Sequence, residues 1–106
     1  MSDRLGKLLE FYNQDKNDTF VRYGIALEYK ATGDLDEAVK WLEGLRQNFT
    51  AYLPTYYQLG ETYSTMGQYA KAQTVLEEGI RLARHDNDGH TLSELQALLD
   101  EVETEL

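Results

Sequence analysis

The chain has 106 residues and no cysteine, and its 19 acidic and 10 basic side chains give a formal net charge of −9. These values exclude a disulfide framework and a thiolate metal site, and an acidic chain repels the phosphates of nucleic acid. No apolar stretch reaches the roughly 20 residues of a membrane-spanning helix, and residues 1–7 lack the apolar run of a signal peptide, so we expect a cytoplasmic protein without membrane contact.

The acidic balance has two interpretations. It favours solubility, or it reflects adaptation to high salt, because only five lysines accompany the many carboxylates. Net charge bears on solvent and partners rather than on fold, so both interpretations stay open here.

The first predicted element is a leading helix, followed by a turn, within residues 1–17. The segment from Asn13 to Asp18 is polar and forms the expected connection. Asp18 or Asn17 is expected to cap the next helix, because a side-chain oxygen at this place accepts a backbone N–H of the first turn.

Residues 19–52 are expected to form two helices joined by a turn. Ile25 and Tyr29 lie on one face of the first helix, one turn apart. Gly33 stands where this helix must end, because the left-handed residue after a helix is usually glycine. Asp34 then caps the second helix.

The same pattern recurs 34 residues later, so that residues 53–86 align with residues 19–52. Glycines recur at the turn, and alanines recur where two helices must cross closely. The matched pairs include Tyr23–Tyr57, Tyr29–Tyr63, Gly33–Gly67, Ala38–Ala72, Leu42–Leu76 and Glu43–Glu77. Pro54 suits the first turn of the helix that opens the second pair.

These residues carry a resemblance to the tetratricopeptide repeat. The second unit has an aromatic residue, a Leu-Gly pair, a tyrosine and then an alanine at the spacing of that repeat. The residues concerned are Tyr56, Leu59, Gly60, Tyr63 and Ala72. The runs at 33–38 and 67–72 are similar to its turn. The resemblance implies an all-α fold, an α-α superhelix of antiparallel helix pairs with about six helices.

The flanking segments are expected to complete one domain over residues 1–106. The leading helix resembles the second helix of a truncated preceding repeat. Residues 91–105 are predicted to form a capping helix that begins with a capping box from Thr91 to Glu94. Its apolar residues follow at helical spacing and its outer surface is acidic, as a terminal helix requires. The predicted order is therefore 1–17, repeat 19–52, repeat 53–86 and cap 91–105.

No group of residues indicates catalysis, a cofactor or a metal. His85, Asp86, Asp88 and His90 flank a polar break, but their spacing matches no zinc signature. A calcium-binding loop starting at Asp86 would need a glutamate where Ala97 stands. No catalytic triad or phosphate-binding glycine loop is present, so we expect no enzyme.

The tyrosines separate into core residues and groove residues. Core positions of the repeat hold Tyr29, Tyr56, Tyr63 and Tyr69, whereas Tyr23 and Tyr57 lie on another face. In the tetratricopeptide repeat family this face lines a concave groove. The residues carried over to that groove are Phe20, Tyr23, Leu27 and Lys30 from the first pair, and Tyr57, Gln58, Glu61, Ser64 and Thr65 from the second. Exposed aromatic rings suit peptide anchoring, unless a terminal helix packs there and buries them.

The resemblance also restricts the partner. Tetratricopeptide domains that grip the acidic C-termini of chaperones use lysine, asparagine and arginine in this groove. Here Tyr23, Leu27, Tyr57 and Glu61 occupy those places, and only Lys30 could attract a carboxylate. We therefore expect an unidentified protein or peptide with an apolar, aromatic or basic segment.

Two functions stay open. The first is a monomeric interaction module with a peptide or helix in its groove. The second is a self-associating structural protein, because two repeats are short for a solenoid. Trp41, Phe49, Tyr52 or an imperfect cap would extend such a stack. Trp41 either packs between helices or stays exposed as an interface anchor.

Overall fold

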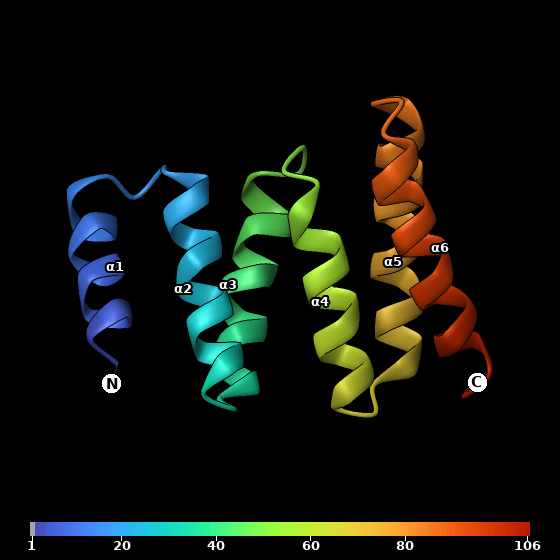
Figure 1. The fold of residues 1–106 in the computed structure, drawn as a ribbon, viewed down its shortest axis with the longest axis horizontal. Helices are drawn as coiled ribbons and strands as arrows, with labels where there is room; N and C mark the ends of the chain where they lie inside the picture. Colours follow the sequence, from blue (N-terminus) through green and yellow to red (C-terminus); the bar gives the residue numbers. More distant parts are fainter. Residues whose placement is uncertain (1) are drawn as a thin grey trace. The chain divides into compact units, whose positions relative to one another are not determined.

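The computed structural model describes residues 2–106, in which every secondary-structure element is an α-helix. The helices are α1 (Asp3–Gln14), α2 (Thr19–Ala31), α3 (Leu35–Asn48), α4 (Pro54–Thr65), α5 (Tyr69–His85) and α6 (Gly89–Glu103) (Figure 1). Helices that follow each other pack in pairs: α1 on α2, α2 on α3, α4 on α5, and α5 on α6. The expected all-α, tetratricopeptide-like fold of about six helices is confirmed.

The contacts divide the chain into two compact units. Unit 1 is Met1–Tyr52 and contains α1 to α3, and unit 2 is Leu53–Leu106 and contains α4 to α6. In unit 2, α4 also contacts α6. Each unit therefore holds one helix more than a single repeat.

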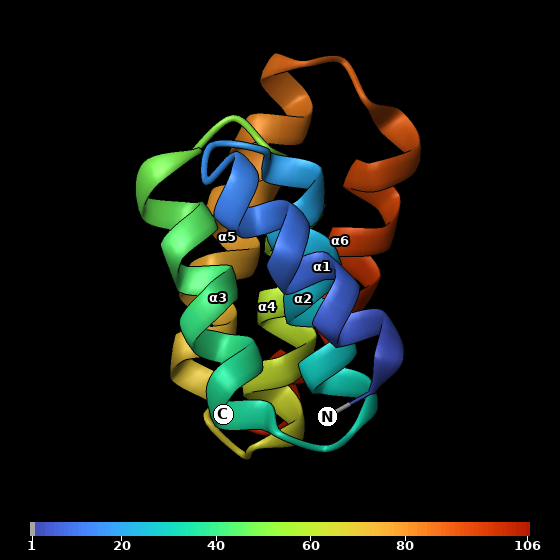
Figure 2. The same ribbon diagram turned by 90° about the vertical axis from the view of Figure 1, so that its left-hand side faces the viewer.

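The core of unit 1 forms where α1 packs on α2. Leu5 of α1 meets Val21 and Ile25 of α2, and all three side chains are buried. Figure 2 looks onto α1 with α2 behind it. At Gly24 a Cβ would lie 3.3 Å from Leu8 Cδ2, so the missing side chain allows α1 to approach.

Trp41 completes this core from α3. Its half-buried ring packs against the cluster and meets the ring of Tyr12 edge-on, with the ring centroids 4.9 Å apart and the planes at 81°. Aromatic pairs favour this geometry because the positive ring edge faces the negative ring face. Trp41 therefore packs between helices and is not the exposed interface anchor of the alternative interpretation.

The core of unit 2 depends on two glycines at helix crossings. A Cβ at Gly60 would lie 2.5 Å from Leu76 Cδ2 and 2.7 Å from its Cγ. A Cβ at Gly79 would lie 2.6 Å from Tyr56 Cβ and 3.2 Å from Leu95 Cδ1. Non-bonded Cβ contacts below 3.0 Å are essentially unknown, so a side chain at Gly60 would force Leu76 to shift, and one at Gly79 would collide with a Tyr56 carbon close to the backbone.

Three helices end in the same way, with a left-handed residue directly after the last turn. These residues are Gly33 with φ 84°, Gly67 with φ 76° and Asn87 with φ 56°. In each case the following N–H donates to a carbonyl five residues back, at 2.9, 2.8 and 2.9 Å respectively. The sequence predicted the two glycines. The third site uses asparagine, which tolerates this conformation better than other side chains.

Side-chain caps begin α2 and α3 as predicted. Asp18 Oδ1 accepts the N–H of Val21 at 3.1 Å, and Asp34 Oδ1 accepts the N–H of Glu37 at 3.3 Å. Helix α4 has no side-chain cap and begins instead at Pro54, whose missing N–H leaves no donor to satisfy.

The predicted start of α6 is wrong. The capping box at Thr91 was expected to begin this helix, but Asp88 is the cap and the helix begins at Gly89. Asp88 Oδ1 accepts the N–H of Thr91 at 3.1 Å, and Asp88 Oδ2 accepts its hydroxyl at 2.8 Å. A carboxylate accepts both donors of Thr91 at once, which leaves the threonine inside the first turn.

The helix crossing at Gly79 gives a stability prediction. Gly79→Ala should lower the free energy of unfolding by about 1–3 kcal/mol, because its Cβ would overlap a Tyr56 carbon fixed close to the backbone. The matched control is Gly44→Ala in α3, where a Cβ would meet nothing within 4 Å. That change should raise the free energy of unfolding by about 0.5–1 kcal/mol, since alanine favours helix. Urea unfolding measures both free energies. Equal effects of the two substitutions would contradict the prediction that Gly79 is required for the close helix crossing.

The α6 cap gives a pH prediction. The pKa of Asp88 lies below its ordinary value of 3.8, chiefly because the Thr91 backbone N–H, and then its hydroxyl, donate to the carboxylate. A lowered pKa in the fold means that the ionised carboxylate stabilises the protein above pH 3.8 and that this contribution is lost as the pH falls through the folded pKa. Asp88→Ala should therefore lower the Tm at neutral pH, and its difference from wild type should shrink below pH 3.8.

Asp86→Ala is the control for this measurement. Its carboxylate contacts the exposed His85 ring at 3.3 Å and caps no helix start. A Tm loss at neutral pH as large as that of Asp88→Ala would show that the capping bonds of Asp88 are not what stabilises α6.

Candidate peptide-binding surfaces

The groove residues predicted in unit 1 lie on one face of α2. Phe20, Tyr23, Leu27 and Lys30 follow each other at spacings of three and four residues, which places them along one stripe of the helix. Phe20 is 73% exposed, and the other three are half-buried. The stripe thus keeps aromatic and aliphatic surface accessible from unit 1.

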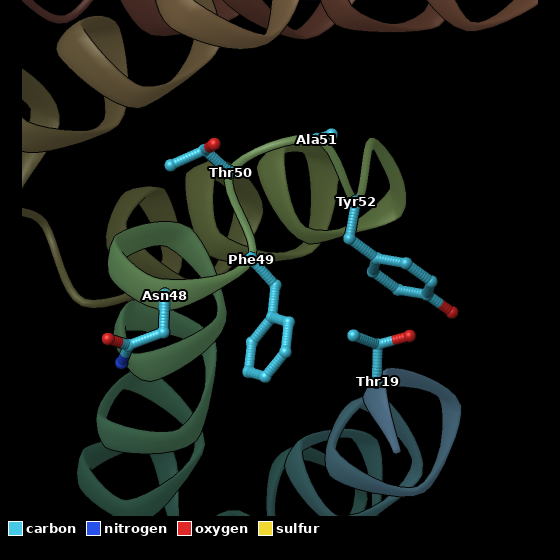
Figure 3. Close-up of a pocket in the computed structure, with 6 residues that line it drawn as sticks. All are labelled: Thr19, Asn48, Phe49, Thr50, Ala51 and Tyr52. Atoms are coloured by element: carbon cyan, nitrogen blue, oxygen red, sulfur yellow. The ribbon is translucent and has the colours of Figure 1, made fainter. Parts of the chain in front are cut away.

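A hollow of about 470 Å³ lies where α3 ends, next to the start of α2 (Figure 3). Its lining residues are Thr19, Asn48, Phe49, Thr50, Ala51 and Tyr52. In Figure 3 the rings of Phe49 and Tyr52 point toward the side of Thr19, whereas Asn48 and Thr50 point elsewhere. The hollow is therefore walled by two aromatic rings.

Neighbouring groups hold both rings of this hollow. The Tyr52 ring meets the Tyr23 ring edge-on at 5.7 Å, which connects the hollow to the α2 stripe. The guanidinium of Arg22 lies 5.1 Å from the Phe49 ring centroid. Burial, and then the carboxylate of Asp18, raise the pKa of Tyr52 above 10.0, so its hydroxyl is neutral at physiological pH.

The sequence missed this hollow. Phe49 and Tyr52 were noted only as residues for self-association, and Thr19 was not noted at all. Thr19 begins one helix and Phe49 follows the next. No sequence periodicity relates Thr19 to Phe49. The one feature of the sequence that could have indicated the hollow is the pair of aromatic residues, Phe49 and Tyr52, on either side of Thr50 and Ala51.

The groove residues predicted in unit 2 lie on α4. Tyr57, Gln58, Glu61 and Ser64 are half-buried, and Thr65 is exposed and donates its hydroxyl to the Glu61 carbonyl at 3.0 Å. Tyr57 and Glu61 are one turn apart and share a side-chain hydrogen bond. The α4 residues therefore share one side of their helix, as those of α2 do in unit 1. The groove that would join the two sets stays a prediction.

Helix α6 adds carboxylates to this α4 side. Burial, and then Glu61, Glu94 and Glu101, raise the pKa of Tyr57 above its ordinary 10.0. Glu94 and Glu101 are two turns apart on α6, and α6 contacts α4. We call Tyr57, Glu61, Glu94 and Glu101 the Tyr57 surface. The sequence missed the α6 members because it assigned this helix only a covering role.

The division of the tyrosines is supported in part. Tyr56 and Tyr63 are 5% exposed, as core residues should be. Tyr29 is half-buried and packs against the core of unit 1, and Tyr69 is also half-buried. Tyr23 and Tyr57 are likewise half-buried, so a terminal helix covers neither ring completely.

The polar break contains no cluster that could bind a metal. Among residues 2–106, no three histidine, aspartate or glutamate side chains come together in an arrangement that could hold a metal ion. His90 Nε2 lies 3.1 Å from Glu94 Oε1, and both side chains are exposed. Over the same residues, no helix has the length and apolar character needed to cross a membrane.

Comparison with known proteins agrees with this geometry. A tetratricopeptide repeat family model matches residues 21–44 and 53–86. No curated protein matches the chain. A tetratricopeptide repeat domain protein from Salinibacter ruber, solved in solution, is 31% identical, with a TM-score of 0.80 over 85% of this chain and 91% of that chain.

Two further solved structures are similar. The crystal structure of a tetratricopeptide repeat domain protein from Salinibacter ruber is 31% identical, with a TM-score of 0.79 over 83% of this chain and 98% of that chain. A protein from Bordetella parapertussis shares the fold, with 23% identity and a TM-score of 0.84 over 99% of this chain and 91% of that chain. With its matched repeats and helix pairs, the chain belongs to the tetratricopeptide repeat family, whose domains are generally protein–protein interaction modules.

Proposed function

We propose that this protein holds a peptide or helix of a partner protein along the stripe of α2 and the corresponding side of α4. One observation carries the proposal: the first helix of each repeat keeps aromatic surface off the core. Phe20 is 73% exposed and Tyr23 and Tyr57 are half-buried, whereas Tyr56, next to Tyr57, is 5% exposed. Rigid rings bind well because they bury much area at little entropic cost.

The partner segment is not an acidic C-terminal tail. Such a tail would bring carboxylates beside Glu61 and the α6 carboxylates near Tyr57, and like charges repel in a partly desolvated place. On α2, Lys30 is the one basic residue of the stripe. Apolar, aromatic or basic residues suit both helices better, so the chaperone-tail mode of the family is not proposed here.

The proposed role is a scaffold and not an enzyme. The two histidines lie on exposed ends of α5 and α6, where each contacts a neighbouring carboxylate. Binding energy rather than chemistry is what the aromatic surfaces can supply.

Peptide display on the full chain tests this role. Peptides recovered by wild type should bind Tyr23→Ala and Tyr57→Ala about tenfold or more weakly, because each change removes an aromatic anchor. The Tm should change little, since neither ring is part of the buried core. Phe11→Ala is the control, because Phe11 is 54% exposed on α1 and is not one of the proposed groove residues, so this variant should bind as wild type.

Two results would contradict the proposal. The first is wild-type affinity in both tyrosine variants. The second is unfolding of Tyr57→Ala, which would place Tyr57 in the core beside Tyr56. Tyr56→Ala gives the scale for that comparison, because removing a buried aromatic side chain costs about 3–5 kcal/mol.

Self-association is the alternative function, and the hollow between Phe49 and Tyr52 is the feature that favours it. Trp41 is less available for such contacts because it packs on Tyr12. A net charge of −9 opposes association of identical copies. We therefore propose a monomer. Sedimentation velocity over a wide concentration range should give one constant monomeric mass, and a mass that rises with concentration would support the alternative.

A further inference from the structure

We propose that the hollow of unit 1 receives one large neutral side chain, aliphatic or aromatic, from the partner segment that lies along the α2 stripe. This inference rests on the proposed function and names the chemistry of one contact within it. The hollow has a volume of about 470 Å³ and lies between the turn after α3 and Thr19 at the start of α2 (Figure 3). All of its lining residues belong to unit 1.

The hollow forms because α3 ends early. The 34-residue period aligns Ala51 with His85, the last residue of α5, whereas α3 ends at Asn48. The segment that continues the helix in the second repeat therefore leaves it in the first, where Phe49 has a non-helical backbone with φ −136° and ψ 59°. At the place aligned with Phe49, helix α5 carries the completely buried Ala83. The hollow is thus a local departure of the first repeat from the second.

Neighbouring groups hold both aromatic walls in place before a ligand arrives. Tyr23 of the stripe meets the Tyr52 ring edge-on, with the ring centroids 5.7 Å apart. Arg22 Cζ lies 5.1 Å from the Phe49 ring centroid, and Arg22 Nε donates to the carbonyl of Lys16. Rings that are already positioned lose little conformational freedom on binding, so more of their contact energy contributes to affinity.

Charges of opposite sign lie at the two walls, which favours a neutral occupant. Arg22 lies at the Phe49 wall, and Asp18 immediately precedes the lining residue Thr19. Burial, and then the Asp18 carboxylate, raise the pKa of Tyr52 at the other wall. An acidic side chain would therefore meet Asp18, and a basic one would meet Arg22. Either would also lose water between two aromatic rings, which costs more for a charged group than for an apolar one.

The hollow lies at one end of the α2 stripe. Phe20 is 73% exposed and directly follows Thr19, and the stripe runs from there to Lys30. At the rise of an α-helix this stripe is about 15 Å long, which about five residues of an extended segment cover. A segment on the stripe thus places its apolar residue in the hollow at one end, and its other residues contact Tyr23 and Leu27.

A second copy of this chain is the competing occupant, because it exposes Phe11 and Phe20. Its net charge of −9 opposes the approach of an identical chain. A hollow of about 470 Å³ also accepts a side chain without supplying the extended apolar area that a stable dimer interface buries. A partner segment that is already held along the stripe fits the hollow better.

The experiment starts from one peptide that the wild-type chain recovers from a random displayed library. Its large apolar residues are replaced by alanine one at a time, and fluorescence anisotropy measures each affinity. We expect one replacement to weaken binding about tenfold or more, because it withdraws a large apolar side chain from a buried contact. At that position lysine and glutamate should each bind no better than alanine, because each meets a like charge beside the hollow.

Protein variants locate this peptide residue in the hollow. Phe49→Ala removes one wall, and Thr19→Leu fills part of the space and keeps both rings, so each should weaken the original peptide about fivefold or more. In both variants the original peptide and its alanine form should bind almost equally, because the two changes remove the same contact. Thr19→Leu decides the test if Phe49→Ala has a lowered Tm.

Matched controls carry the same substitutions away from the lining of the hollow. Phe11→Ala and Thr74→Leu change exposed side chains on α1 and α5. Both should keep the full difference in affinity between the original peptide and its alanine form. Loss of that difference in the controls would overturn the inference, because the effect would then not belong to the hollow.

The outcomes separate the inference from the proposed function. Peptides that need Tyr23 and Tyr57 but bind Phe49→Ala and Thr19→Leu as tightly as wild type would overturn the inference and leave the interaction module standing. Lysine or glutamate that replaces the apolar residue without loss of affinity would do the same.

Two other results would remove both proposals. The first is a peptide that binds Tyr23→Ala and Tyr57→Ala as tightly as wild type, or no recovered peptide at all. The second is a mass that rises with concentration in wild type and stays constant in Phe49→Ala, because a second copy would then occupy the hollow.

Discussion

The structure depends on helices that approach closely where a side chain is missing or is only a methyl group. Ala26, Ala38 and Ala72 are completely buried, and a Cβ at Gly60 or Gly79 would collide with a neighbouring side chain. Each such contact fixes which side of a helix faces its partner, because a rotation would bring a larger residue into the crossing. The side of each helix that does not face a partner helix is therefore fixed as well.

The proposed binding surfaces are a consequence of this constraint. Gly79 holds Tyr56 inside unit 2, and Tyr57, one residue further along, must then leave the crossing by about 100°. In unit 1, Ile25 is turned into the core beside Leu5, and Tyr23 lies at the side. Tyr23 meets Tyr52 edge-on and Tyr57 bonds to Glu61, but neither ring belongs to the buried core. The packing of neighbouring residues turns both rings away from the core, so we expect that either ring can be replaced without loss of the fold.

Local signals explain how much of this arrangement the sequence could predict. Gly33, Gly67, Asp18 and Asp34 act on the residues next to them, so their turns and caps follow from short motifs. Asp88 was missed because Thr91 begins an equally good capping pattern, and only the structure shows which oxygen accepts the donors. The other sites that were missed join segments far apart in the chain.

The α2 stripe and the α4 side could be predicted because the repeat period places them. The hollow at Tyr52 and the α6 carboxylates could not be predicted, since each combines residues of one helix, or of the turn after it, with residues of another helix. Periodicity predicts which side of a helix faces the core. It does not predict which other helix lies next to the side that faces away from the core. That information depends on packing distance and crossing angle.

Helix α6 shows how one requirement can serve two purposes. A terminal helix must be polar on its outer side, whether its charges are acidic or basic, because that side faces water. Here Glu94 and Glu101 are acidic and act on Tyr57. Lysines at both places would cover the core of unit 2 equally well, since the buried residues Leu95, Leu98 and Leu99 would be unchanged. They would reverse the field at the tyrosine. The fold therefore requires a polar outer side on this helix, and it leaves the sign of the charge there open.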